Sequence, residues 1–207
     1  MTDLVLVRHG ETVWHAENRY AGLSDIDLTP RGLEQADRLA GWAAGAGLTG
    51  VWASTLSRAR ITAEASAGKA GLTVRVDARL CELDFGEGDG LTSAEMQARF
   101  PEARAAFESD PAGHPLPGGE DPHQAATRFV AALQDIAAAH QGGRVLVVAH
   151  TTAIRLALCR LIGVPLGEYR RLFPRLDNCA LTELRLPEPG AGRAALLQYN
   201  SPIGAVR

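Results

Sequence analysis

An apolar run that ends in an arginine and a histidine, LVLVRHGE at residues 4–11, decides the fold of this chain. Leu4 to Val7 are four consecutive apolar residues, and such a run is typical of a strand that is buried on both faces, as in a parallel sheet. A second run, VLVVAHTT at residues 145–152, has a similar composition and also ends in a histidine. The two runs therefore predict two buried strands of a parallel sheet.

Helical patterns lie between and after these runs. Apolar residues keep a spacing of about 3.6 residues over 33–43 and 126–137, and a third apolar segment, 152–162, ends before Gly163. Weaker strand signals lie at 50–53 and 73–76, and a hairpin is indicated at 181–186 and 194–199, across a Pro/Gly-rich turn. This alternation predicts an α/β fold, a three-layer α/β/α sandwich with a mostly parallel central sheet.

Length and charge limit the organisation of the chain and its partners. A chain of 207 residues is expected to form a single domain over 1–207, with a lid-like excursion at about 83–121 that holds one short helix near 93–100. Lysine and arginine number 21 against 24 aspartate and glutamate residues, which gives a net charge of −3. This balance argues against nucleic acid and membrane surfaces as partners. A homodimer through the hairpin or a sheet edge stays open.

The cysteines and the N-terminal segment indicate a cytoplasmic location. Cys81, Cys159 and Cys179 form an odd set with no C-x-x-C pair, which fits a reducing compartment better than a disulfide scaffold or a zinc ribbon. Residues 1–11 lack the basic flank and apolar core of a signal peptide. The uncharged run 39–57 is interrupted by four glycines, so we interpret it as a helix end, a turn and a strand.

Two histidines follow the two confident strands. Ligands of open α/β sheets bind beyond the carboxyl ends of the strands, so His9 and His150 are expected to meet in that crevice. A single histidine in this place is more often structural, but two at equivalent strand ends favour a functional site. Gly10 fits either a close backbone approach to a ligand or an ordinary turn.

Arginine beside these histidines indicates an anionic ligand. The guanidinium of Arg8 matches the geometry of phosphate oxygens and stays charged at all relevant pH values. The helix that begins at Thr151 and Thr152 is expected to add backbone N–H groups and the positive end of its dipole. Arg58, after the turn 54–57, either reaches the same place or is a solvated surface charge.

Four motifs now carry a resemblance to a known family. The first is LVRHGET at residues 6–12, followed by Trp14, Arg19, Gly22, DLT at 27–29, Gly32 and QA at 35–36. The second is STLSRA at 54–59 with TA at 62–63, the third is CELDFG at 81–86, and the fourth is VVAHTTAI at 147–154. In this order and spacing they resemble the histidine phosphatase superfamily, which includes the cofactor-dependent phosphoglycerate mutases. The resemblance implies a phosphoglycerate mutase-like fold.

The resemblance also implies a mechanism. His9 would attack a phosphate monoester to give a phosphohistidine, and Arg8, Arg58 and His150 would hold the phosphate oxygens. Glu82 would protonate the leaving alcohol and then deprotonate water. From the residues alone, Asp84 and Glu87 compete with Glu82 for that role.

No metal ion or other cofactor is implied by this scheme. The competing hypothesis is a metal site built by the three histidines nearest to the first and fourth motifs, His9, His15 and His150. The adjacent Arg8 and Arg58 argue against it, because they would repel a cation.

Several positions depart from the family pattern, so pocket shape transfers less well than chemistry. His15 stands where a phosphate-contacting asparagine is usual, and a neutral histidine also offers one N–H donor. Thr151 and Thr152 replace a Gly-Gly pair. Gly88-Asp89 replaces Trp-Glu, which is expected to remove bulk near the entrance. The loop GGED at residues 118–121 is expected either to touch substrate or to start a helix.

The leading hypothesis is a metal-independent phosphatase that acts on a small phosphorylated metabolite. The first alternative is a phosphoglycerate-type mutase, which the short chain and the lack of a basic stretch after Glu82 disfavour. The second is a catalytically weak module that binds phosphate esters, which has no need of His9 and Glu82 together. Substrate contacts are expected from His15, Ala21, Gly22 and Thr151. We interpret Trp14 and Trp52 as packing residues, Cys159 and Cys179 as small buried hydrophobes, and His114, His123 and His140 as surface residues.

Overall fold

A single mixed sheet forms the centre of the computed structural model, which describes residues 1–188 and 192–204. Its strands lie in the order β3-β2-β4-β1-β5-β6. The bounds are β1 Thr2–Arg8, β2 Gly50–Ala53, β3 Val74–Val76, β4 Arg144–Ala149, β5 Leu181–Leu186 and β6 Ala195–Ser201. β3, β2, β4 and β1 are parallel, while β5 and β6 pair antiparallel. The predicted mostly parallel sheet is confirmed.

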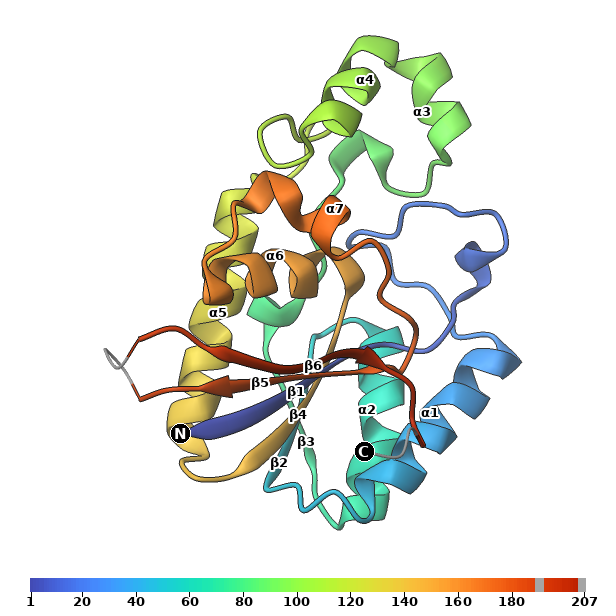
Figure 1. Cartoon of the computed structure of the whole chain (residues 1–207). Helices are drawn as coiled ribbons and strands as arrows, with labels where there is room; N and C mark the ends of the chain where they lie inside the picture. The colour runs from blue at the N-terminus through green and yellow to red at the C-terminus, as the bar shows by residue number, and fades with distance from the viewer. Residues whose placement is uncertain (189–191, 205–207) are drawn as a thin grey trace.

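Helices cover both faces of this sheet (Figure 1). Their bounds are α1 Pro30–Ala43, α2 Ser57–Ala70, α3 Ser93–Arg99, α4 Pro101–Ser109, α5 Pro122–Ala139, α6 Thr151–Ile162 and α7 Tyr169–Leu172. One apolar cluster joins the sheet to α5 and α6, and a second joins it to α1 and α2. These two clusters make the predicted three-layer sandwich.

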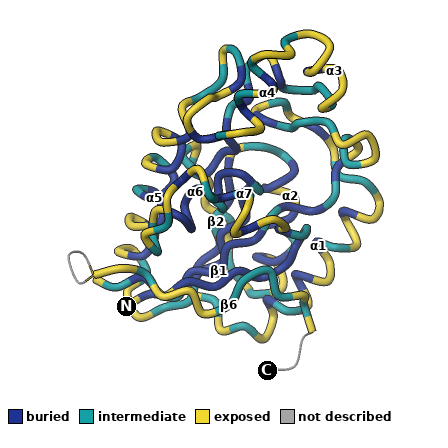
Figure 2. The backbone as a smooth tube through the Cα atoms, turned by 45° about the horizontal axis from the view of Figure 1, so that its top comes forward, coloured by how far each residue is buried: buried dark blue, intermediate teal, exposed yellow. Residues whose placement is uncertain are grey.

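The apolar run of β1 is explained by these two clusters. Leu4 and Leu6 pack into the cluster beneath α5 and α6, whereas Val5 and Val7 pack into the other. Successive side chains of a strand point to opposite faces, so a strand in the middle of a sandwich needs apolar residues at every position. Figure 2 shows the buried backbone at β1 and the exposed residues on the outer helices.

The register of the two central strands positions the site. Arg8 of β1 lies opposite Ala149 of β4, and the His9 N–H donates to the Ala149 carbonyl at 3.1 Å. The two strands are parallel and end together, so His9 and His150 leave the sheet side by side. Beyond β4, α6 begins directly and ends at Gly163, whose φ of 80° is the left-handed conformation expected at a helix end.

The excursion at 83–121 holds two helices rather than the one predicted. α3 ends at Arg99, and α4 begins at Pro101. Phe100 leaves the helical conformation because proline disfavours it in the preceding residue, and proline is well suited to the first position of a new helix. Figure 1 shows α3 and α4 at the top, beyond the sheet.

The C-terminal hairpin of β5 and β6 is confirmed, with β6 beginning at Ala195 rather than at Ala194. Residues 189–191 of its predicted turn, and residues 205–207 at the chain end, lie outside the described residues. No helix in the described part of the chain is long and apolar enough to cross a bilayer.

Candidate active site

His9 is held in one tautomer by its neighbour. Its Nδ1 lies 2.7 Å from the Gly10 carbonyl oxygen, which only accepts hydrogen bonds, so Nδ1 carries the proton. The lone pair is then on Nε2. The backbone carbonyl of His9 accepts from the side-chain amide of Asn178 at 2.8 Å, which fixes the main chain at this point. The geometry thus leaves Nε2 as the unprotonated nitrogen of His9.

Burial keeps His9 neutral. Its side chain is almost completely buried, and burial, His150, Arg58 and Arg8 together hold the pKa of the imidazole well below 6.5. The His9 and His150 rings are 5.1 Å apart between centroids. A neutral imidazole keeps a lone pair on one ring nitrogen, which is the form that nucleophilic chemistry requires of a histidine.

Gly10 is required by packing. A Cβ atom at this position would lie 2.5 Å from the carbonyl oxygen of Gly32 in α1. The N–H of Gly10 donates to the Thr62 hydroxyl, which itself donates to the Arg58 carbonyl. Gly10 therefore joins the loop after β1 to both helices of that face, and this packing is a reason for glycine that the sequence did not indicate.

Arg8 and His15 are directly linked. Arg8 Nη2 lies 2.7 Å from His15 Nε2, and Arg8 Nη1 donates to the Leu176 carbonyl at 3.0 Å. Burial, followed by the charge of Arg8, lowers the pKa of His15 to about 4. Burial also lowers the pKa of Arg8 to about 10, so the guanidinium is charged at neutral pH. His15 therefore positions Arg8 as a neutral partner.

Arg58 is fully buried, so it is not a solvated surface charge. Its Nη1 donates to the Ser24 carbonyl at 2.7 Å and its Nη2 to the Gly22 carbonyl at 2.8 Å. Two neutral carbonyls fix the guanidinium without neutralising it, so its positive charge acts on the site.

His150 is fully buried and is held by Ser54, with 2.7 Å between Nε2 and the hydroxyl oxygen. That oxygen accepts the Leu56 N–H at 3.3 Å, and we assign its own proton to the bond with Nε2. In that assignment Nδ1 of His150 carries a proton that no group within residues 1–188 and 192–204 accepts. Burial and Arg58 hold the pKa of this ring well below 6.5.

Glu82 lies against the start of α6. Its Oε1 accepts the backbone N–H groups of Leu83 and Ala153, each at 2.8 Å, and its Oε2 accepts that of Thr152 at 2.9 Å. These bonds fix the carboxylate at the positive end of the helix. Of the N–H groups expected from the helix start at Thr151 and Thr152, that of Thr152 is therefore occupied by the Glu82 carboxylate rather than open to an anion.

A cavity of about 440 Å³ brings the predicted residues together. Its lining includes Arg8, His9, Thr12, His15, Asn18, Arg19, Tyr20, Ala21, Glu82, Phe85, Ser93, Thr151, Thr152, Arg155, Arg170 and Pro174. The lining does not include Arg58, His150 or Gly22. Arg58 and His150 are nevertheless close enough to the cavity to lower the pKa of His9, which lines it. Gly22 acts on Arg58 through its carbonyl.

Buried hydrogen-bonding groups without partners gather at this site. Six such side-chain atoms occur in the described residues, and Ser66 Oγ is the one that belongs elsewhere. The other five are Arg8 Nε, Arg58 Nε, His150 Nδ1, Thr151 Oγ1 and Arg155 Nε. All five can donate, and buried donors rarely stay unpaired in native proteins. The site therefore fits a ligand rich in acceptors.

Neither competitor of Glu82 lines the cavity. Asp84 accepts the Gly86 N–H at 2.8 Å, and Glu87 forms an ion pair with Arg99 on the surface. Of the three carboxylates, Glu82 is the one that lines the cavity together with His9.

Two further expectations concern Gly88-Asp89 and the loop 118–121. Gly88 is buried, and a Cβ there would lie 2.5 Å from Leu116 Cδ1. Asp89 accepts from the backbone of Gly22 and Ser24. Both residues thus hold the loop structure, and their effect on bulk near the entrance stays a prediction. In the loop 118–121, Asp121 caps α5 through the His123 N–H, which agrees with the helix-start alternative.

Residues that sequence reasoning did not single out complete the site. Arg155 lies one helical turn after Thr151, and this spacing could have revealed it. Ser54 stood in the second motif without a role. Tyr20, Arg170 and Asn178 gave no signal, because tertiary packing alone brings them to the cavity.

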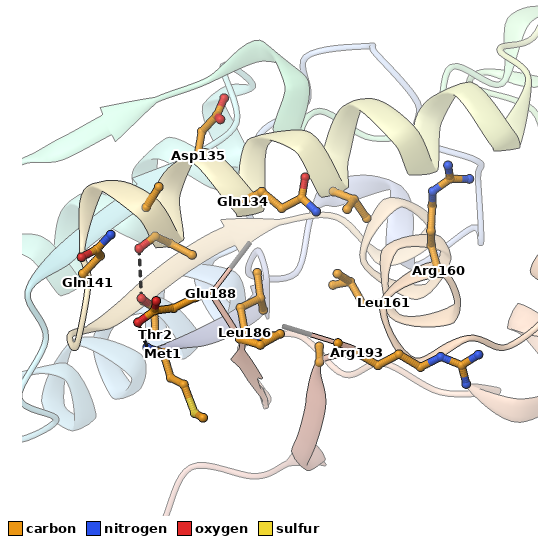
Figure 3. A pocket seen from close by; sticks show the side chains of 16 residues that line it. Met1, Thr2, Gln134, Asp135, Gln141, Arg160, Leu161, Leu186, Glu188 and Arg193 are labelled. Atoms are coloured by element: carbon orange, nitrogen blue, oxygen red, sulfur yellow. Dashed lines mark hydrogen bonds and ion pairs between the residues drawn. The ribbon is translucent and has the colours of Figure 1, made fainter. Parts of the chain in front are cut away.

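A larger cavity of about 610 Å³ lies elsewhere (Figure 3). Side chains of α5, α6 and β5 line it, among them Gln134, Arg160 and Leu186. It contains none of the motif residues, so its size does not make it the site.

The remaining predictions concern metal sites and the cysteines and histidines that were given no functional role. Within 1–188 and 192–204, no three His, Cys, Asp or Glu side chains are grouped as metal ligands would be. Cys159 and Cys179 are buried, as expected. His114 and His123 are exposed, but His140 is half-buried and accepts from the Trp52 indole at 3.3 Å, so its interpretation as a surface residue is wrong.

Comparisons with known proteins agree with this geometry. Residues 4–201 match the model of the histidine phosphatase superfamily, branch 1. A probable phosphoglycerate mutase, GpmB, from Salmonella paratyphi B is 36% identical over 193 residues, which cover 91% of this chain and 86% of that protein.

Two solved structures superpose closely on this chain. Bacillus stearothermophilus YhfR gives a TM-score of 0.90 at 28% identity, with 98% of each chain covered. A mycobacterial glucosyl-3-phosphoglycerate phosphatase, solved in complex with VO3, gives 0.88 at 29% identity, with 97% of this chain and 99% of that chain covered.

Proposed function

The chain belongs to branch 1 of the histidine phosphatase superfamily, and we propose that within it the protein is a phosphatase that hydrolyses small phosphate monoesters through a phosphohistidine on His9. One observation carries this proposal. The buried donors without partners at Arg8, Arg58, His150 and Thr151 surround a neutral histidine whose Nε2 is unprotonated. A tetrahedral phosphate dianion supplies the acceptor oxygens that these donors lack.

In the proposed first step, His9 Nε2 forms a bond to phosphorus while the bond from phosphorus to the ester oxygen breaks. Arg8, Arg58 and His150 stabilise the charge on the three equatorial oxygens. For this step Glu82 carries a proton on Oε2, which accepts one backbone N–H group whereas Oε1 accepts two. The leaving oxygen takes that proton and departs as the alcohol.

In the second step, water attacks the phosphohistidine. Glu82 accepts a proton from that water, the bond from phosphorus to Nε2 breaks, and inorganic phosphate leaves. His9 is regenerated with its proton still on Nδ1, where the Gly10 carbonyl holds it. The scheme needs no metal ion, because the guanidinium groups supply the positive charge.

Hydrolysis is preferred here over mutase chemistry because of the excursion at 83–121, for which we propose a lid role. Its two arginines are both occupied: Arg99 pairs with Glu87, and Arg104 pairs with Glu108. A mutase must hold its product and exclude water, so it gains from free cations in such a segment. The 36% identity to a probable phosphoglycerate mutase keeps mutase activity as the second candidate.

A substrate panel tests the proposal. The purified protein is incubated with sugar phosphates, phosphoglycerates, nucleotides and p-nitrophenyl phosphate, with and without a chelator, beside His9→Ala. Phosphate release that survives the chelator and is lost in His9→Ala supports a metal-independent phosphatase. Conversion of 3- to 2-phosphoglycerate without net phosphate release would replace it by the mutase. Binding without turnover of any compound would instead identify a phosphate-ester binding module.

A further inference from the structure

We infer that Arg155 and Arg170 form a second anion-binding subsite in the same cavity, so that the substrate is a phosphate monoester with one further anionic group, a carboxylate or a second phosphate. This inference rests on the proposed function and adds the class of substrate to it. Neither arginine takes part in the phosphoryl-transfer scheme above, although both line the cavity with His9.

Arg155 extends the site along α6. It lies four residues after Thr151, on the same face of the helix and about 6 Å farther along its axis. Its Nε is buried and has no hydrogen-bond partner. Among the described residues, no carboxylate lies within ion-pair distance of Arg155.

Arg170 faces this cavity from α7 and is fixed by aromatic rings. Its Nε donates to the Tyr169 hydroxyl at 3.0 Å, and its guanidinium carbon lies 4.5 Å from the centre of the Phe107 ring. The Tyr20 ring, which also lines the cavity, is 6.0 Å from that carbon. These contacts orient the guanidinium and leave its charge in place.

Neighbouring arginines show the contrast. Arg19 also lines the cavity but forms ion pairs with Glu17 and Glu95, and Arg104 beside Tyr20 pairs with Glu108. Their charges are therefore neutralised within the protein. In the described part of the chain, neither Arg155 nor Arg170 forms an ion pair with a carboxylate.

The groups around Arg155 explain why an anion would bind there. Burial lowers the pKa of Arg155, and the nearby charge of Arg170 lowers it further. Glu82, the one carboxylate among its charged neighbours, is engaged by three backbone N–H groups. Tyr169, Tyr199 and Arg8 are further titratable neighbours. An anion bound between the two guanidinium groups would offset the cost of burying their charges and would reduce the repulsion between them.

The spacing sets the length of the ligand. One helical turn separates the phosphate donors at Thr151 from Arg155, so the second anionic group is expected about two or three carbons from the ester oxygen. Matched pairs of compounds therefore serve as probes. Glycerol 3-phosphate and 3-phosphoglycerate differ by a hydroxymethyl and a carboxylate, and propane-1,3-diol monophosphate and bisphosphate differ by a second phosphate.

The experiment measures kcat/KM for both pairs with the wild-type protein and with Arg155→Gln, Arg155→Lys, Arg170→Gln and Arg160→Gln. Arg160 is the matched control, because it lies exposed on α6 and lines the other cavity. We expect the wild type to prefer the acidic member of at least one pair by about tenfold or more. This preference should fall by a similar factor in Arg155→Gln and in Arg170→Gln. It should partly return in Arg155→Lys and should be unchanged in Arg160→Gln.

The comparison within each pair separates the subsite from folding. A folding defect lowers the rates for both members equally, whereas loss of the subsite changes their ratio. Equal rates of the wild type on both members of both pairs, or ratios that Arg155→Gln and Arg170→Gln leave intact, would overturn the inference. The pair that shows the preference identifies the second anionic group of the substrate as a carboxylate or as a phosphate.

Failure of the proposed function gives a different result. If the wild type hydrolyses none of the four compounds, their dissociation constants are measured by calorimetry with the same variants. Tighter binding of an acidic member that depends on Arg155 and Arg170 supports the subsite even then. Equal binding within both pairs rejects it.

Discussion

Arg8 and His15 form a guanidinium–imidazole contact, with 2.7 Å between Nη2 and Nε2. A cationic donor at this distance keeps the imidazole neutral, and the pKa of His15 is lowered to about 4 by burial and by Arg8. A neutral ring accepts at one nitrogen only, so Arg8 at Nε2 competes for that acceptor with the backbone N–H of Thr12, which lies 3.0 Å from Nδ1. Asparagine offers an uncharged acceptor of similar reach.

His15→Asn is accordingly expected to keep kcat/KM for phosphate release within about threefold of the wild type at pH 7. Steady-state kinetics on the best substrate of the panel check this, with His15→Leu as the variant that cannot accept from Arg8. A collapse of His15→Asn to background would mean that His15 does more than hold Arg8.

Glu82→Gln is expected to lower kcat on alkyl phosphates by about a hundredfold or more, because an alkoxide leaving group needs a proton. The loss on p-nitrophenyl phosphate should be much smaller, since p-nitrophenolate leaves without protonation. Glu87→Gln, on the surface, is the control. Equal losses on the two kinds of ester would contradict the general-acid role.

The free energy of unfolding is expected to decrease as the pH is lowered below 6.5. Burial holds the pKa values of His9 and His150 well below 6.5 and that of His15 at about 4, so between pH 6.5 and 5 the unfolded chain binds more protons than the folded one. Lowering the pH therefore favours unfolding. The salt-bridged and hydrogen-bonded carboxylates, with reference pKa values of 3.8, act at lower pH.

Urea denaturation at pH 7.5, 6 and 5 measures this effect as a decrease in the free energy of unfolding. His15→Asn removes one of the three groups, so its decrease should be smaller. A free energy of unfolding that stays constant or rises over this range would show that the histidines are not held neutral.

Gly10→Ala is expected to destabilise the protein by about 2–3 kcal/mol, because the new Cβ would meet the Gly32 carbonyl oxygen at 2.5 Å. Gly41→Ala in α1 is the control: its Cβ would meet nothing within 4 Å, and alanine favours a helix by about 0.5–1 kcal/mol. Thermal unfolding of both variants checks the opposite signs. Equal shifts would refute the packing role of Gly10.

The central sheet and its helices could be predicted because their signals are local. Apolar runs such as 4–7 and 145–149 identify buried strands without knowledge of their partners, and Gly163 marks the end of α6. The sequence pattern does not indicate α4, because a proline such as Pro101 commonly marks the end of a helix. In this protein the same residue begins a new helix. Local patterns do not distinguish these two roles of proline.

The candidate site was predictable where motif order carried it, as for His9 and His150. The hydrogen bonds of Glu82 to α6 join residues 70 and 71 positions apart, so no local pattern reports them. The same holds for Arg170, which meets Tyr20 across 150 positions. Packing of α7 against the excursion creates that part of the cavity.

The phosphohistidine on His9 is the central claim, and rapid-quench mass spectrometry tests it most directly. The wild-type protein is mixed with excess substrate and quenched under alkaline conditions, which preserve phosphohistidine, and its peptides are then mapped. We predict one added phosphoryl group on the peptide that contains His9, formed before phosphate release is complete and absent from His9→Ala. Full turnover with no phosphorylated peptide at any time, or with the phosphoryl group on a residue other than His9, would contradict the account.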